Sequence, residues 1–253
     1  MYYYSIIIPV YNRPDEVDDL LYSLTRQAYK DFEVLVVEDG STKPCRDVVV
    51  RYEREMNVRY FVIPNGGPSG ARNYGAKESA GDYLLILDSD CVLPDTYLET
   101  IDRSLIQRPV DAFGGPDKSH ESFTPIQKAI SYSMTSFFTT GGIRGGKRKL
   151  DRFYPRSFNM GIRRDVFSSL NGFDTSMRYG EDVDFSMRIV KAGYQTMLIP
   201  EAYVYHKRRT SFPQFFRQVE HSGSARIILS KKYPGSMKLV HCLPALFVVG
   251  VVA

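Results

Sequence analysis

A run of apolar residues leads directly into two carboxylates in the stretch Tyr83-Leu84-Leu85-Ile86-Leu87-Asp88-Ser89-Asp90. A short, continuous apolar run of this kind is typical of a strand buried on both faces of a sheet. Because Asp88 and Asp90 lie two residues apart, an extended backbone would point both side chains the same way. Two oxygen ligands on one side favour Mg²⁺ or Mn²⁺ over zinc, which prefers sulfur and nitrogen.

Strand-like and helix-like patterns alternate through the first hundred residues. Strands are expected at residues 3–10, 32–37, 60–63 and 83–87, and helices at residues 14–24, 45–56 and 71–79. A polar loop follows each strand, and this alternation predicts an α/β fold with a parallel, doubly wound sheet. Ligands of such sheets bind outside the carboxyl ends of the strands, so Asn12, Asp39, Asp88 and Asp90 are expected to converge.

The second half of the chain is less regular and contains a second acidic motif. We expect a strand at residues 111–115, an amphipathic segment at 126–138, a mobile glycine-rich basic loop at 141–152, a helix at 182–192 and a strand at 196–205. The motif Gly180-Glu181-Asp182-Val183-Asp184 opens that helix, where one acid would suffice as a cap. Three adjacent acids repel one another, so at least one is a candidate general base. Since each residue turns a helix by ~100°, Asp182 and Asp184 cannot face the same site.

Composition and charge exclude several classes of protein. Of the 253 residues, 43% are hydrophobic and 25% are charged, which excludes a disordered, collagenous or multispan membrane protein. A net charge of +4 is too small to indicate a nucleic-acid partner. The three cysteines contain no Cys-x-x-Cys pair, so we expect a reducing compartment rather than a disulfide framework or a zinc finger. Residues 1–10 lack the pattern of a signal peptide, which favours a cytoplasmic location.

Two segments at the end of the sequence differ from the rest. Residues 211–238 mix aromatic and aliphatic side chains with Arg and Lys, a pattern typical of an amphipathic helix at a lipid interface. Core packing explains the aromatic residues equally well. Residues 239–253 are mostly apolar but fall short of the ~20 residues that span a bilayer. They are similar to the beginning of a membrane helix, and a strand or helix packed on the core is an equal alternative.

The loop at residues 66–70 matches neither the P-loop nor the dinucleotide-binding pattern, so kinase-like and dehydrogenase functions lose their main support. Five other motifs occur in order: Ile6-Ile7-Ile8-Pro9-Val10-Tyr11-Asn12-Arg13, Glu38-Asp39-Gly40-Ser41, Gly70-Ala71-Arg72-Asn73-Tyr74-Gly75, Asp88-Ser89-Asp90 and Gly180-Glu181-Asp182-Val183-Asp184. Together they resemble the family 2 glycosyltransferases with a GT-A fold. The resemblance covers residues 5 to about 205. It implies a GT-A catalytic domain at residues 1–210, with a Rossmann-like, mostly parallel twisted sheet flanked by helices.

The resemblance also implies an inverting transferase that moves a sugar from a nucleotide diphosphate, usually UDP, to an acceptor hydroxyl with the help of Mn²⁺ or Mg²⁺. Inverting displacement needs a base opposite the departing phosphate and a cation beside that phosphate, so one carboxylate cannot serve both ends. The resemblance places the nucleotide pocket at Pro9, Tyr11, Asn12 and Arg13, with Asp39 as a contact of the uracil ring. It implies ribose and diphosphate contacts at Arg72 and Asn73 and a ribose or sugar contact at Asp88. Asp90 would be a metal ligand, and Asp182 would be the catalytic base. His206 matches a third metal ligand or a phosphate contact of related enzymes, and a surface histidine explains it equally well.

The resulting hypothesis is a metal-dependent glycosyltransferase of cell-surface polysaccharide or glycolipid assembly. Its partners would be a UDP-sugar and a saccharide or lipid-linked acceptor, with no nucleic acid. It would act in the cytoplasm, at the inner face of the membrane if the tail binds lipid. A nucleotidyltransferase is an alternative, although such an enzyme needs a glycine-rich loop where this chain has Val10-Tyr11-Asn12-Arg13-Pro14. A non-catalytic sugar-nucleotide-binding or scaffold protein is the other alternative.

Overall fold

The computed structural model describes residues 1–121, 123–135, 153–207 and 210–237, which divide into two compact units. The first unit comprises Met1–Lys118 and Leu150–His206, and the second Ser119–Lys149 and Lys207–Ala253. The division of the sequence into residues 1–210, 211–238 and 239–253 stays a prediction. The segments 141–152 and 239–253, which the sequence analysis singled out, lie outside the described residues.

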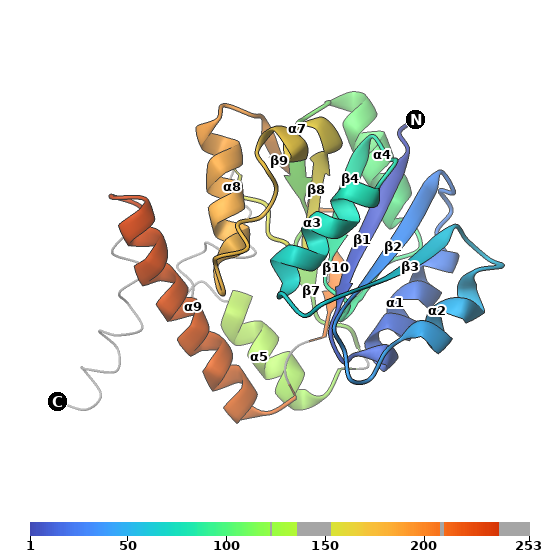
Figure 1. Cartoon of the computed structure of the whole chain (residues 1–253), viewed down its shortest axis with the longest axis horizontal. Coiled ribbons are helices and arrows are strands. Elements are labelled where there is room, and N and C mark those ends of the chain that lie inside the picture. Colours follow the sequence, from blue (N-terminus) through green and yellow to red (C-terminus); the bar gives the residue numbers. More distant parts are fainter. Residues whose placement is uncertain (122, 136–152, 208–209, 238–253) are drawn as a thin grey trace. The chain divides into compact units, whose positions relative to one another are not determined.

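A seven-stranded sheet forms the centre of the first unit, in the order β3-β2-β1-β4-β8-β6-β9 (Figure 1). Its strands are β1 (Tyr4–Val10), β2 (Phe32–Asp39), β3 (Val58–Ile63), β4 (Tyr83–Leu87), β6 (Ala112–Gly114), β8 (Asn159–Arg163) and β9 (Thr196–Leu198). β1 pairs in parallel with β2 and β4, and β2 pairs in parallel with β3. β8 runs antiparallel to both of its neighbours, β4 and β6. The predicted α/β fold with a mostly parallel sheet is therefore confirmed.

Alternate side chains of the central strands build two apolar clusters, one on each face of the sheet. Ile6 and Ile8 belong to the cluster that includes side chains of α1, α2 and α4, whereas Ile7 belongs to the cluster with side chains of α7 and α8. The helices of this unit are α1 (Pro14–Thr25), α2 (Arg46–Tyr52), α3 (Pro68–Glu78), α4 (Tyr97–Gln107), α7 (Arg164–Ser169) and α8 (Glu181–Lys191). The three isoleucines are fully buried, and such burial contributes roughly 1.5–3 kcal/mol for each side chain.

The ends of α1 follow from its sequence. Pro14 occupies the first turn, where its missing N–H costs no hydrogen bond, and Asp15 and Glu16 complement the positive end of the helix. Leu20 and Leu24 are among the residues that this helix buries, as the apolar periodicity predicts. This helix start positions Arg13, the residue that precedes it, at the carboxyl end of β1.

A second, three-stranded sheet in the same unit has the order β5-β10-β7. It consists of β5 (Cys91–Val92), β7 (Asp117–Lys118) and β10 (Val204–His206). The single strand predicted at residues 196–205 is wrong, because β9 and β10 are separate strands in different sheets. Pro200 has no N–H to donate to a ladder, and the N–H of Ala202 turns back to the carbonyl of Ile199. This break brings His206 opposite Cys91 in β5.

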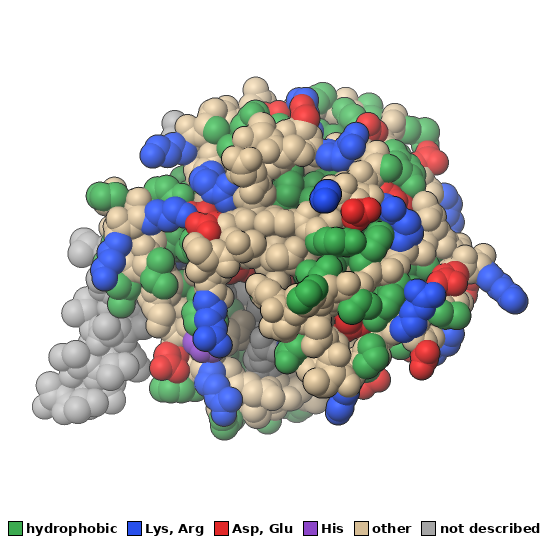
Figure 2. Space-filling view, viewed as in Figure 1, with side chains coloured by type: hydrophobic (Ala, Val, Ile, Leu, Met, Phe, Trp, Pro, Cys, Tyr) green, Lys and Arg blue, Asp and Glu red, His purple; other side chains and the backbone are tan. Residues whose placement is uncertain are grey.

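The second unit contains the helices α5 (Pro125–Thr135) and α9 (Phe212–Lys232). α9 lies within the predicted helical tail and buries Ala225 and Leu229, while Phe212, Phe216 and Val219 are exposed. Among the helices of the described residues, none combines the length and the apolarity that crossing a bilayer requires. Basic and acidic side chains are interspersed over the face of the protein drawn in Figure 2, which agrees with the small net charge.

Candidate active site

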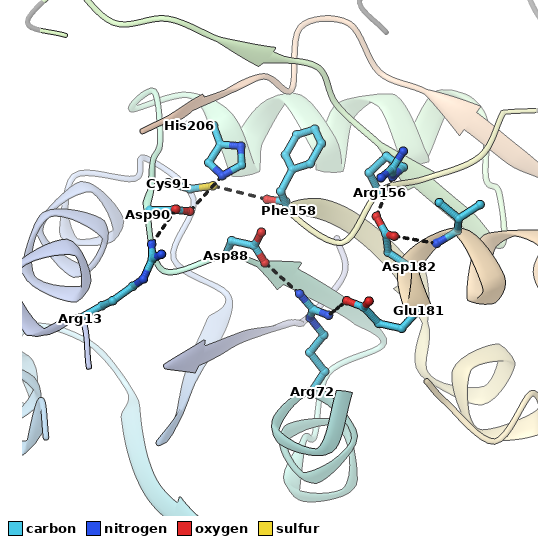
Figure 3. A network of polar contacts seen from close by, with 11 residues as sticks. Arg13, Arg72, Asp88, Asp90, Cys91, Arg156, Phe158, Glu181, Asp182 and His206 are labelled. Atoms are coloured by element: carbon cyan, nitrogen blue, oxygen red, sulfur yellow. Dashed lines mark hydrogen bonds and ion pairs between the residues drawn. The ribbon is translucent and has the colours of Figure 1, made fainter. Parts of the chain in front are cut away.

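The two carboxylates that follow β4 lie in a turn and have different partners. The N–H of Cys91 donates to the carbonyl of Asp88 (3.1 Å) and closes this turn. Asp88 accepts a hydrogen bond from Arg72 (3.0 Å), whereas Asp90 accepts one from Arg13 (2.7 Å). The prediction that both side chains point the same way in extended backbone is therefore wrong. The Asp-Ser-Asp motif instead supplies one carboxylate to each of two neighbouring polar clusters (Figure 3).

The first cluster surrounds Asp90, which is 8% exposed. Its Oδ2 binds Arg13, and its Oδ1 lies 3.0 Å from Nε2 of His206. The pairing of β10 with β5 delivers His206 to this position, and the imidazole stacks on the ring of Phe158 with 5.3 Å between centroids. Burial alone would raise the pKa of Asp90, but the charges and hydrogen bonds of His206 and Arg13 hold it well below its usual range. Asp90 is therefore ionised, which is the form that binds a cation.

Asp90 and His206 fit a divalent cation. Ligand atoms on one edge of an octahedron with bonds of ~2.1–2.2 Å lie ~3 Å apart, close to the separation of the Asp90 and His206 atoms. Carboxylate and imidazole are both ligands that Mn²⁺ accepts. The sulfur of Cys91 completes a group of three ligand-type atoms that lie within 4.8 Å of one another. A thiol prefers softer metals, so Asp90 and His206 are the residues that would hold Mn²⁺ or Mg²⁺.

The second cluster is built around Arg72 of α3, which is 4% exposed. Its guanidinium donates to Asp88 through one terminal nitrogen and to Glu181 through the other (2.8 Å). Burial would lower the pKa of Arg72, and the charges of Asp88 and Glu181 raise it, so the group stays charged. Arg72 thus ties the end of β4 to the beginning of α8.

Asp182 lies in the first turn of α8 and is 9% exposed. The helix is preceded by Gly180 in the left-handed conformation (φ 78°), which favours glycine. Oδ1 of Asp182 accepts the N–H of Val183 (2.8 Å), and Oδ2 accepts Nε of Arg156 (2.6 Å). Burial raises the pKa of Asp182, but the charges of Arg156 and Arg72 lower it below its usual value.

Asp184 turns away from this cluster, as the helical geometry predicts. It is fully buried and accepts a hydrogen bond from Arg188 one turn further along α8 (2.9 Å). Arg188 also donates to the carbonyls of Leu170 and Gly172. Asp184 therefore anchors the loop before α8, and Asp182 is the acid of the pair that faces the site.

The comparisons agree with this architecture. A model of the family described as Glycosyl transferase family 2 matches residues 5–170. The chain belongs to this family. Its fold is the GT-A fold, because it superposes on the mannosyltransferase PcManGT from Pyrobaculum calidifontis, which was solved in complex with GDP-Man and Mn²⁺. The TM-score is 0.69 at 18% identity, and the superposition covers 94% of this chain and 66% of that one. S. aureus TarS 1-349 in complex with UDP gives a TM-score of 0.63 at 21% identity over 94% and 68% of the two chains.

Relatives in sequence are named as glycosyltransferases. The chain is 25% identical over 217 residues to the uncharacterized glycosyltransferase EpsJ of Bacillus subtilis (strain 168), covering 83% of this chain and 62% of EpsJ. It is 32% identical over 197 residues to an uncharacterized glycosyltransferase of Haemophilus influenzae, covering 74% and 62%. The chain thus spans about three-fifths of the length of these two relatives.

The family's predicted site residues fall into a central group and a surrounding group. Figure 3 shows Arg13, Arg72, Asp88, Asp90, Asp182 and His206 gathered in one region. Asp39 lies at the end of β2 and accepts the N–H groups of Gly66 (2.7 Å) and Gly67 (2.9 Å). Asn73 exchanges two hydrogen bonds with the backbone of Phe173. Asp39 and Asn73 therefore hold loops at the edge of the site.

The residues expected to bind the nucleotide begin where β1 ends. Pro9 belongs to β1, and Tyr11, directly after the strand, is 51% exposed. The side-chain oxygen of Asn12 accepts the N–H of Lys43 (2.8 Å), so Asn12 contacts the loop after β2 rather than the acids after β4. Of the four side chains expected to converge, Asp88 and Asp90 belong to two neighbouring clusters. Asn12 and Asp39 instead contact neighbouring loops.

Two site residues were not found by sequence reasoning. Glu181 was recognised only as part of the acidic motif, in which repulsion between neighbouring acids indicated a general base. In the structure each of the two acids has its own cation, since Arg72 pairs with Glu181 and Arg156 pairs with Asp182. Arg156 belongs to no motif of the sequence and comes from the segment just before β8, so it carried no signal.

Proposed function

We propose that this chain transfers a sugar from a nucleotide diphosphate, with UDP favoured, to an acceptor hydroxyl, with inversion at the anomeric carbon and dependence on a divalent cation. The observation that carries the proposal is the separation of two carboxylate centres by Arg72. Asp90 and His206 lie on one side with metal-ligand spacing, and Asp182 lies on the other at the start of α8 (Figure 3). Inverting displacement requires such a division, because the base and the leaving group act on opposite faces of the sugar.

The transfer itself is a single displacement. The acceptor oxygen attacks the anomeric carbon, the bond from that carbon to the diphosphate oxygen breaks, and its electron pair leaves with the nucleotide. The acceptor proton passes to Asp182, which is ionised and therefore able to receive it. Bound Mn²⁺ or Mg²⁺ supplies charge neutralisation to the diphosphate. Arg13 holds the ligand Asp90, and Arg72 holds Asp88 and Glu181 at a fixed spacing.

The donor is recognised through its base and its diphosphate. Asp39 accepts two backbone N–H groups, and a carboxylate offers about four acceptor positions in all. The remaining positions suit the N–H of a uracil ring. The solved relatives include complexes with UDP, with UDP-GlcNAc and with GDP-Man. These complexes support a nucleotide-sugar donor for this chain.

The cellular role follows from the same proposal. The acceptor would be a saccharide or a lipid-linked saccharide in cell-surface polysaccharide or glycolipid assembly, at the inner face of the membrane. α9 supports the membrane contact, because it exposes Phe212, Phe216 and Ile227 and also carries the basic residues Arg226, Lys231 and Lys232. Flotation of the full chain with anionic liposomes tests this contact. A protein that stays at the bottom of the gradient contradicts it.

Calorimetric titration with UDP and with GDP, each with and without Mn²⁺, tests the donor and the metal together. The proposal predicts binding of UDP that needs the metal, weaker binding of GDP, and loss of the metal effect in Asp90→Ala. Equal affinity for UDP with and without Mn²⁺ would show that the Asp90 cluster is not a metal site for the nucleotide. No binding of either nucleotide would leave only the non-catalytic alternative.

A further inference from the structure

The proposed base is held in a weakly basic state by a neighbouring arginine. Nε of Arg156 lies 2.6 Å from Oδ2 of Asp182, while the N–H of Val183 occupies Oδ1. Both contacts stabilise the ionised carboxylate, and the charge of Arg72 adds to them. A base whose charged form is stabilised in this way has less tendency to take a proton from a hydroxyl. Transfer would therefore be faster if Arg156 left Asp182.

The backbone of Arg156 is anchored, whereas its side chain is held within the described residues by one hydrogen-bonded ion pair and is partly exposed. The hydroxyl of Ser186 in α8 donates to the carbonyl of Pro155, and the N–H of Asn159 donates to the carbonyl of Arg156 (3.0 Å). The side chain itself is 32% exposed. Its hydrogen bond to Asp182 uses Nε, and within the described part of the chain the terminal nitrogens have no hydrogen-bond partner. Those nitrogens carry four N–H donors that a ligand can use.

The charges around Asp182 indicate what the departure of Arg156 would do. Two arginines, Arg72 and Arg156, face the three carboxylates Asp88, Glu181 and Asp182. Arg72 is hydrogen-bonded to the first two of these acids. Without Arg156, Asp182 would adjoin Glu181 with no cation of its own, and a like charge favours uptake of a proton. Removal of Arg156 thus turns Asp182 into a stronger base.

A neutral acceptor offers nothing that would replace the carboxylate as a partner of Arg156. An anionic group does, because the planar guanidinium fork matches phosphate and carboxylate oxygens in a bidentate geometry. Resting on the function proposed above, we propose that the acceptor carries a phosphate or carboxylate group beside its reacting hydroxyl, and that Arg156 leaves Asp182 to bind this group. Arg156 is then a specificity-determining residue, and the base is released only when a charged acceptor is in place.

Donor hydrolysis in the presence of small anions tests this coupling. Water takes the place of the acceptor: its oxygen attacks the anomeric carbon, the bond to the diphosphate breaks with its electron pair on the nucleotide, and a proton passes to Asp182. The probes are methyl phosphate and acetate, with glycerol as the neutral control, at constant ionic strength and constant free Mn²⁺. In the wild type each anion should raise the hydrolysis rate several-fold and saturably, while glycerol should not.

Variants of Arg156 test whether this residue binds the anion and thereby raises the rate of hydrolysis. Arg156→Gln should hydrolyse the donor faster than the wild type without any anion and should gain nothing from either anion. Arg156→Lys, which keeps the charge but loses the fork, should retain a weakened response. Arg26→Gln is the matched control, because Arg26 makes a two-point contact with Asp95 on the surface (3.0 and 2.6 Å) away from the site. It should respond as the wild type does.

Titration of methyl phosphate into UDP-saturated protein gives a readout that needs no turnover. The wild type and Arg26→Gln should bind the anion, and Arg156→Gln should not. Equal binding to Arg156→Gln, or an unchanged response of its hydrolysis to anions, overturns the inference while the proposed function stands. A large loss of UDP affinity in Arg156→Gln also overturns it, because Arg156 would then belong to the donor site. Failure of the wild type to bind UDP at all would instead remove the proposed function.

Discussion

Replacing Arg72 with methionine tests the buried arginine that joins the end of β4 to the start of α8. The variant Arg72→Met keeps the length of the side chain but leaves Asp88 and Glu181 without their shared cation. Breaking a buried ion pair by removal of one partner costs about 3–5 kcal/mol. Asp88 is 32% exposed, so water compensates part of its loss, and the lower end of that range, about 3 kcal/mol, is expected. For a chain of this size each kcal/mol lowers Tm by about 2–4 °C, which gives a decrease of about 6–12 °C.

Thermal unfolding followed by circular dichroism at neutral pH measures this change. Arg26→Met serves as the control, since it removes an ion pair whose two side chains are 53% and 51% exposed. Exposed pairs contribute little, so its Tm should stay within about 1 °C of the wild type. Equal Tm values for Arg72→Met and Arg26→Met would mean that the buried ion pairs of Arg72 stabilise the fold no more than a surface contact does.

Three further changes probe the metal site, the base and the packing of the sheet. His206→Ala should weaken Mn²⁺ binding in the presence of UDP by at least about tenfold, and a calorimetric titration that gives the wild-type affinity would exclude His206 as a ligand. The pKa of Asp182 lies below its usual value, so Asp182 is ionised at every pH above that value. As pH falls, kcat/KM should therefore decrease only below about pH 4. A decrease near pH 6 would point to another base. Gly161→Ala should lower the free energy of unfolding by about 1–3 kcal/mol, because its Cβ would lie 2.0 Å from the ring of Phe113. Gly70→Ala lies in α3 with open space around its Cβ, and since alanine is a better helix former than glycine, it should unfold at or slightly above the wild-type denaturant concentration.

Local pattern was sufficient to predict most of the central sheet. The run Ile6-Ile7-Ile8 is a strand because its side chains are buried on both faces, and the two clusters of the structure divide it as alternation requires. The helical turn of ~100° per residue predicted that Asp182 and Asp184 do not face the same site. The structure confirms this, because Asp182 pairs with Arg156 and Asp184 pairs with Arg188. Both predictions rest on geometry within one element.

The errors have a common physical origin in contacts between distant parts of the chain. Asp88 and Asp90 lie in a turn, and each is paired with an arginine from elsewhere in the sequence. His206 reaches Asp90 because β10 pairs with β5, a contact between residues more than a hundred positions apart. Arg156 could not be found at all, because a lone arginine before a short strand has no spacing that distinguishes it. Sequence patterns thus predicted the strands and helices from β1 to β4, and long-range pairing decided which side chains meet.

The anomeric configuration of the released sugar shows directly whether the chain is an inverting glycosyltransferase. The full chain is incubated with Mn²⁺ and a UDP-α-sugar, and the product is followed by proton NMR before mutarotation. An inverting enzyme with Asp182 as its base forms the β-anomer and UDP together, whereas Asp182→Asn should form neither while it still binds UDP. Release of the α-anomer, or wild-type turnover in Asp182→Asn, would contradict the assignment of Asp182 as the base of an inverting glycosyltransferase.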